Sequence, residues 1–468
     1  MENNRSRAGR KTENRARPQM GPAPLAVWAA GAGAVLQLVV LRQIGQGGDV
    51  LFASPGLVYG VLFLAAAFAV PNGVAGAVRA RMKKGKTGEA SRLFSVSLIL
   101  ALAVGAILAA LLFFGGGWIA GRAGGRESAA VWRALALAAL FAAGSGAVRG
   151  YFYGMGVSAP GVISILLEAA GGGAAALWLA AAGQAQGERS ALVYGTDLYR
   201  NVFGAEGAVL GLGAGAALSF GFLLLALMVC RREMFSPGGR KKSPAALGLE
   251  ISAAALPGIV TVLAFGGCFL SGAFRLAGED GAAWAGIGRS RLAVWAVSSA
   301  VCALGVGRAS YLPRARRSMR TCLTSAAVRT AAAGAVGGLV LALAWRPLSA
   351  FLFPGTEAPS LGAAVLNGVT VLFLSLAAVT AAALFSLGKR WVAAAAALVA
   401  LAVSLVLSRL LPAALPDSVL RLTAAQAAGP ACFCLLTGAA LALMAGGGGS
   451  RTEKNSRPEP VRGRSRRR

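Results

Sequence analysis

The residues with the greatest capacity for chemistry are a few charged side chains inside or beside long apolar segments. They are Arg42, Glu168, Glu250, Arg275, Arg308 and Arg329. An ionisable side chain within a membrane helix is costly to bury, so it is a candidate for function. Guanidinium groups bind oxyanions such as phosphate through paired hydrogen bonds. We therefore expect these six residues to line a substrate cavity.

A structural role is the alternative for each of them. Glu168 would then bond a backbone group of a neighbouring helix, while Arg42 and Arg308 would extend their guanidinium groups to the membrane surface. The sequence leaves both interpretations open.

Enzyme chemistry has little support in the composition. The chain has no histidine and six cysteines, and Cys432 and Cys434 form the only close cysteine pair. Without histidine or further ligands nearby, that pair does not indicate a metal site. The expected external loops are short and offer no nucleophile with a base. We expect no catalytic residue, no metal and no cofactor.

Hydropathy indicates a membrane protein. The chain is 56% hydrophobic and 13% charged, with a mean hydropathy of +0.66. A soluble domain of this composition would expose large apolar patches. The 65 glycines suit helices that approach one another closely in lipid.

A membrane-spanning helix needs about 20 apolar residues. The segments that meet this length predict an all-α protein of about twelve transmembrane helices, at 22–43, 51–77, 93–120, 130–148, 157–182, 204–230, 246–272, 287–307, 322–347, 360–387, 390–412 and 422–446. The segment 287–307 gives the weakest signal, because Arg289 and Arg291 lie at its start.

Charge placement predicts that both termini are cytoplasmic. With that orientation, the inner segments hold roughly three times as many Lys and Arg residues as the outer segments, as the positive-inside rule requires. The basic tails, 1–20 and 448–468, lack apolar periodicity and are expected to be disordered. We expect them to bind anionic lipid headgroups and not nucleic acid, because no aromatic residue lies between their arginines.

A repeat divides the chain into two lobes of six helices. Val78-Arg79-Ala80-Arg81 and Pro313-Arg314-Ala315-Arg316 each precede further basic residues and a new helix, and two later turns match at nearly the same offset. The predicted units are the lobes 21–230 and 246–447, joined by a basic cytoplasmic linker at 231–245. Parallel repeats of this kind commonly enclose a transport site.

Several motifs resemble a known family. The stretch 149–156, with Arg149, Tyr151 and Gly154, continues through Glu168 and resembles the turn between helices four and five of the stage V sporulation protein B and MurJ-type lipid II flippases. These proteins belong to the multidrug/oligosaccharidyl-lipid/polysaccharide exporter superfamily. Further matching pieces are Arg42–Gly45, Pro71–Arg79 and Ala205–Ala208. We expect Arg79, Arg81, Arg149, Tyr151, Gly154, Arg314 and Arg316 to shape the cytoplasmic turns.

The resemblance implies a flippase in the bacterial cytoplasmic membrane that moves a lipid-linked oligosaccharide or peptidoglycan precursor by alternating access, beside cell-envelope synthesis enzymes. Two departures weaken the inference about the substrate. The family usually has an arginine four residues after the glutamate of helix five, where this chain has Gly172, and many relatives carry two further C-terminal helices. Two alternatives stay open, namely a cation-coupled multidrug antiporter of the same fold and a non-transporting membrane scaffold. The sequence does not predict an oligomeric state.

Overall fold

The computed structural model describes residues 22–122, 125–230, 243–271, 276, 280–310, 316–411 and 418–446. These residues are helical apart from short turns, because hydrocarbon offers no hydrogen-bond partner and each backbone polar group must be bonded within its own helix. The two basic tails and most of the predicted linker lie outside the described residues.

The first half of the chain forms α2 (Pro22–Ile44), α3 (Gly48–Leu64), the π-helix η1 (Ala65–Ala69), α4 (Val70–Met82), α5 (Thr87–Ala120), the 3-10 turn η2 (Arg126–Ser128), α6 (Ala129–Met155), α7 (Ala159–Tyr194) and α8 (Leu198–Val229). The second half forms α10 (Pro244–Leu270), α12 (Gly281–Ala309), α13 (Arg316–Leu352), α14 (Leu361–Ser386), α15 (Arg390–Leu410) and α16 (Ser418–Gly446).

Within the described residues, twelve helical segments are long and apolar enough to cross a membrane. The second of these, Gly48–Met82, is a continuous rod made of α3, η1 and α4. The prediction of an all-α protein with about twelve spans is therefore confirmed, and the weakly predicted segment 287–307 is part of α12. The chain is a multi-pass membrane protein.

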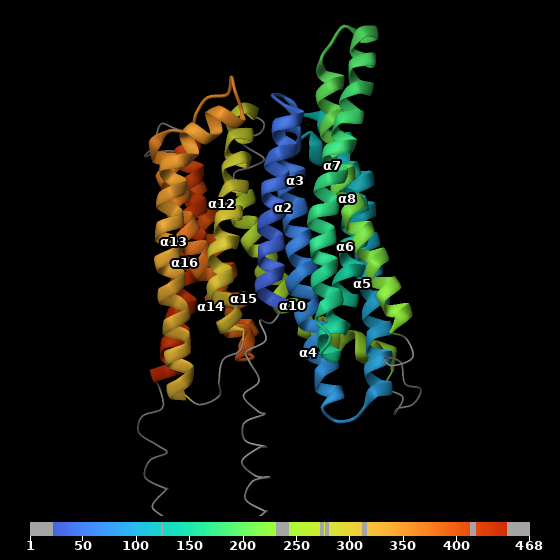
Figure 1. The fold of residues 1–468 in the computed structure, drawn as a ribbon, viewed down its shortest axis with the longest axis vertical. Helices are drawn as coiled ribbons and strands as arrows, with labels where there is room; N and C mark the ends of the chain where they lie inside the picture. Colours follow the sequence, from blue (N-terminus) through green and yellow to red (C-terminus); the bar gives the residue numbers. More distant parts are fainter. Residues whose placement is uncertain are drawn as a thin grey trace, which may run out of the picture.

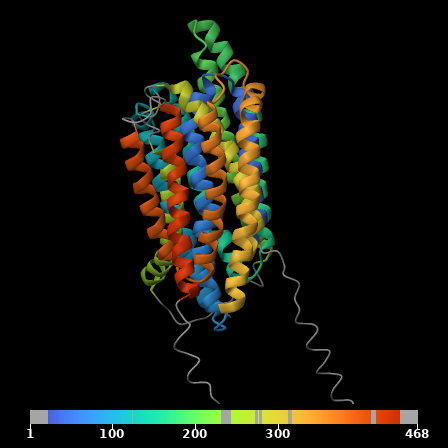
Figure 2. The same ribbon diagram turned by 90° about the vertical axis from the view of Figure 1, so that its left-hand side faces the viewer.

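The helices form an upright bundle in which the two halves of the chain lie side by side. Figure 1 shows α5 to α8 at one side and α13 to α16 at the other, and Figure 2 shows the same bundle from its second-half side. The halves meet where α12 packs on α2 and α3, and where α10 packs on α4. We call the end where α2 begins and α16 ends the terminal end, and the opposite end the distal end.

Two of the helices are longer than the spans predicted at 157–182 and 204–230. α7 continues to Tyr194 and α8 begins at Leu198, so the two helices project past the rest of the bundle at the distal end (Figures 1 and 2). The polar residues after 182 end the apolar run without ending the helix, because the hairpin is stabilised by packing between its two helices.

Glycines allow this packing. A Cβ atom at Gly207, Gly211 or Gly215 of α8 would overlap the backbone of α7. The side-chain-free surfaces let the helix backbones touch, which is how helices gain dispersion energy in lipid, where no hydrophobic force drives them together. Among the described helices, α7 and α8 share the most extensive contact.

We expect Gly215→Val to destabilise the protein by about 1–3 kcal/mol, because the new side chain would push α8 away from Gly172. Gly221→Val on the same helix is the matched control, since a Cβ there meets nothing within 4 Å. The measurement is the fraction of monodisperse protein left after heating in detergent. Equal loss in the two variants would contradict this account of the packing.

Candidate functional site

A buried polar network lies inside the first half. Arg149 on α6 is fully buried, and its Nη2 donates to Glu168 Oε2 at 2.5 Å and to Ser219 Oγ at 2.7 Å. Its Nε donates to Ser164 Oγ at 2.8 Å, and its Nη1 to the carbonyl of Ala66 at 3.3 Å. That carbonyl belongs to η1, where the wider π-helical turn frees a backbone acceptor. Arg149 thus ties α6, α7, α8 and the π-helix together.

This network corrects the expected positions of two residues. We expected Arg149 to shape a cytoplasmic turn, but it lies within α6 and points into the bundle. Glu168 is also fully buried, so its carboxylate faces Arg149 and not the cavity between the halves. The absence of an arginine at Gly172 therefore does not leave Glu168 unpaired, since Arg149 of α6 supplies the partner.

The halves are joined near the terminal end by an ion pair. Arg81 Nη2 of α4 lies 2.7 Å from Glu250 Oε2 of α10, and Arg81 Nε lies 3.9 Å from Glu89. Arg79, two residues earlier on α4, is exposed, and its Nη2 donates to the carbonyl of Tyr153 at 3.0 Å. Glu250 therefore serves as a contact between halves in this conformation, outside the cavity.

A second set of contacts joins the halves toward the distal end. Arg289 Nη1 of α12 lies 2.8 Å from Asp49 Oδ2 at the start of α3. Trp284 Nε1 donates to Ser54 Oγ at 2.8 Å, which adds a neutral bond between the same two helices. The bundle is thus held closed near both of its ends.

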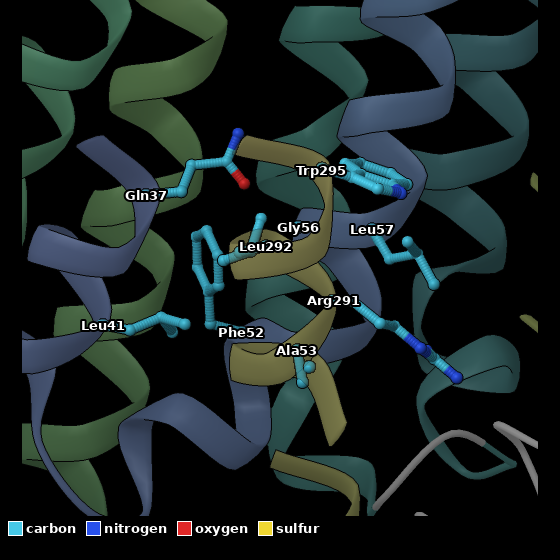
Figure 3. A pocket seen from close by; sticks show the side chains of 10 residues that line it. Gln37, Leu41, Phe52, Ala53, Gly56, Leu57, Arg291, Leu292 and Trp295 are labelled. Carbon is cyan, nitrogen blue, oxygen red and sulfur yellow. The ribbon is translucent and has the colours of Figure 1, made fainter. Parts of the chain in front are cut away.

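Between these contacts lies a small cavity at the boundary of the halves, shown in Figure 3. Its volume is about 20 Å³, enough for about one water molecule. It is lined by α2, α3 and α12, with the side chains Gln37, Leu41, Phe52, Ala53, Leu57, Arg291, Leu292 and Trp295 together with Gly56 and Gly288. Arg291 is its only charged lining residue.

Arg291 is incompletely bonded. Its Nε donates to Gln426 Oε1 at 3.0 Å and its guanidinium stacks on Trp284, 4.4 Å from the ring centroid. Within the described residues, Nη1 and Nη2 are buried without a hydrogen-bond partner. A buried donor without a partner is expensive. Those two nitrogens can therefore receive an anionic oxygen.

The other predicted cavity residues lie elsewhere. Arg42, Arg308 and Arg329 are exposed, and the Arg42 guanidinium lies 5.5 Å from the centroid of the Phe351 ring of α13. None of these three arginines lines the cavity. Arg275 and Arg314 fall outside the described residues.

The other residues that we expected to shape the cytoplasmic turns lie within helices. Tyr151 is fully buried and stacks on Phe94 with ring centroids 4.4 Å apart. Gly154 lies against Val78, where a Cβ would crowd the side chain of that valine. Arg316 begins α13.

Sequence reasoning missed Arg291, Asp49 and the partnership of Arg289. Arg291 was noted only as a residue that weakens a span, and Arg289 as a charge toward the outer side without a partner. Two arginines at the start of an apolar segment were the available signal, because charges kept inside a span mark functional positions.

No protein-family model matches the sequence, and neither does any curated protein. Solved structures do match in three dimensions. The eukaryotic MATE transporter AtDTX14 superposes with a TM-score of 0.68 at 14% identity, over 91% of this chain and 96% of that one. The chain has the MATE transporter fold.

Two further structures agree with this fold. An inward-facing multidrug resistance MATE family transporter of the MOP superfamily gives a TM-score of 0.63 at 14% identity, over 90% of this chain and 94% of that one. A MOP superfamily transporter from Pyrococcus furiosus is described as having a binding pocket of reverse polarity. It gives a TM-score of 0.60 at 16% identity, over 90% of this chain and 93% of that one. The superfamily of these MATE-fold neighbours is the one that the sequence motifs resemble.

Replacing Arg149 by Met should destabilise the protein strongly, by about 3–5 kcal/mol, because it strands the buried Glu168 carboxylate. The double variant Arg149→Met/Glu168→Gln should recover part of that loss. Arg79→Met is the control, as Arg79 is exposed. Thermal unfolding in detergent measures all three. A double variant no more stable than Arg149→Met would exclude an essential charge pairing.

Proposed function

We propose that the chain is a transporter that moves an anionic lipid-linked sugar, an oligosaccharide or peptidoglycan precursor, across the bacterial cytoplasmic membrane by alternating access. The observation that supports this proposal best is Arg291, whose two terminal nitrogens are buried without partners beside the cavity between the halves. A diphosphate linkage offers the oxygens that such a guanidinium binds in pairs.

The balance of buried charge favours an anion. Among the described residues, the buried carboxylates are Asp49 and Glu168, and each has an arginine partner. Glu250, at the boundary of the halves, is paired with Arg81. Arg291 lines the cavity and has no ion-pair partner among the described residues, and an anionic ligand would supply one.

The contacts that join the halves near both ends of the bundle support alternating access. The cavity holds about one water molecule, so a sugar can enter only if the halves separate. MATE family transporters are known in inward-facing and outward-facing conformations. We propose that the lobes 21–230 and 246–447 rock against each other, with the ion pairs Arg81–Glu250 and Asp49–Arg289 opening in turn.

The membrane potential would assist export. With the termini in the cytoplasm, as the charge distribution predicts, each negative charge that moves outward gains about 2.3 kcal/mol per 100 mV of inside-negative potential. The same potential opposes export of a cationic drug.

A multidrug antiporter is the second candidate, because a neighbouring structure is a multidrug resistance transporter. Cationic drugs and coupling cations need free carboxylates. Among the described residues, Asp49 and Glu168 are paired with arginines, whereas the half-buried Glu206 of α8 is in no ion pair. The Pyrococcus furiosus neighbour is described as having a binding pocket whose reverse polarity suggests a different function, which supports considering other substrates for this fold. We therefore rank the flippase first and a non-transporting scaffold third.

The function is tested by depleting the protein in its host and quantifying lipid-linked sugar precursors on each membrane leaflet. We expect precursors to accumulate on the cytoplasmic leaflet, and wild-type protein to reverse this. Arg291→Ala should fail to do so at equal membrane abundance, because it removes the cation of the cavity. Arg346→Ala, an exposed position, is the control that should restore transport.

Other outcomes would redirect the assignment. Unchanged precursors with altered resistance to cationic drugs would support the antiporter. No change in either quantity would favour the scaffold.

The order of gate opening gives a separate prediction. Asp49→Asn should weaken the distal contact to Arg289 and favour opening at that end. A cysteine introduced at Leu57, which lines the cavity, should then react several-fold faster with an impermeant thiol reagent added to intact cells, in a chain whose own cysteines are replaced. Arg81→Gln, which weakens the terminal contact, should not speed the reaction. Equal thiol-reaction rates in the two variants would refute the proposal that the Asp49–Arg289 contact controls opening at the distal end.

A further inference from the structure

Arg329 is an exposed cation on a face of α13 that otherwise suits lipid. The face includes Val328, Val336, Val340 and Leu343, each 58–68% exposed. The adjoining side of α13 is buried at Ala326 and Thr330 against α12. In a membrane, the exposed face of this helix meets acyl chains, and Arg329 lies among them.

The depth of Arg329 follows from its neighbours. Cys322 Sγ lies 3.9 Å from the carbonyl of Arg308, so Cys322 is level with the end of α12. Arg329 is seven residues further along α13, about 10 Å deeper at 1.5 Å per residue. A seven-residue step nearly completes two turns, so Arg329 and Cys322 lie on the same side of the helix. The guanidinium can point back toward the headgroup level.

Within the described residues, Arg329 has no carboxylate within 4.0 Å and no hydrogen-bond partner. Arg308, at the level of Cys322, is also exposed and has no ion-pair partner in the same part of the chain. An arginine beside hydrocarbon is stabilised by an anion, and a lipid headgroup is the anion that the membrane itself supplies. Two arginines at successive depths on one side of α12 and α13 fit a phosphate between them.

We infer that Arg308 and Arg329 form a binding site for the phosphate of an anionic phospholipid on the outer surface of α12 and α13, separate from the cavity that contains Arg291. The acyl chains would lie against Leu304 of α12, which is 56% exposed, and Val336 of α13, which is 63% exposed. Guanidinium groups bind phosphate through paired hydrogen bonds, which a zwitterionic headgroup weakens by its own cation. The site therefore selects anionic lipids.

The test is native mass spectrometry of the full-length protein, delipidated in detergent and titrated with phosphatidylglycerol or with phosphatidylcholine of the same acyl chains. We expect one phosphatidylglycerol to bind preferentially. Arg329→Leu should weaken its binding by more than about tenfold, since it removes a charge-assisted bond pair. Leucine suits a lipid-facing position, so the variant should fold.

Arg346→Leu is the matched control, because Arg346 is exposed near the other end of the same helix. It should weaken binding by less than about fivefold, the effect of one generic surface charge. Equal losses in the two variants, or equal affinities for the two lipids, would overturn the site. A polyprenyl diphosphate that displaces phosphatidylglycerol at lower concentration would also overturn it, by assigning the surface to the transported lipid.

Discussion

Charge neutralisation inside an apolar bundle is the constraint on which this structure depends. A buried ion is costly unless its partner and further hydrogen bonds replace the lost water. Arg149 satisfies this condition with Glu168, two serines and a π-helical carbonyl, all within the first half. Its location there makes four helical segments of that half one unit, so that movement is directed to the boundary between the halves.

Ion pairs also lie at the boundary between the halves, where they join separate halves of the chain. Asp49–Arg289 and Arg81–Glu250 each join one half to the other. Separating either pair requires water to reach the charges, since solvation must then replace the partner. The bundle therefore has a bonded network inside its first half and ion pairs near both ends of its interface. This distribution suits two bodies that move against each other.

Arg291 departs from the rule of paired charges. Its stacking on Trp284 and single bond to Gln426 hold the side chain in place without satisfying it. Among the described residues the buried carboxylates have arginine partners, whereas Arg291 has no carboxylate partner, which is the basis for proposing an anionic ligand. The exposed Arg329 follows the same logic on the lipid side, where only a membrane component can reach it.

The sequence by itself determined the spans and their number, because a run of about 20 apolar residues has few alternatives to a helix in hydrocarbon. It could not assign faces, since these helices are apolar on all sides and give no amphipathic pattern. The sequence therefore predicted Arg329 as a cavity residue and not Arg291, although Arg329 is exposed and Arg291 lines the cavity. Partnerships also needed the tertiary structure: Glu168 found Arg149 on another helix, and Asp49 found Arg289 at a separation of 240 residues. Only helix packing brings such distant residues together, and no local spacing encodes it.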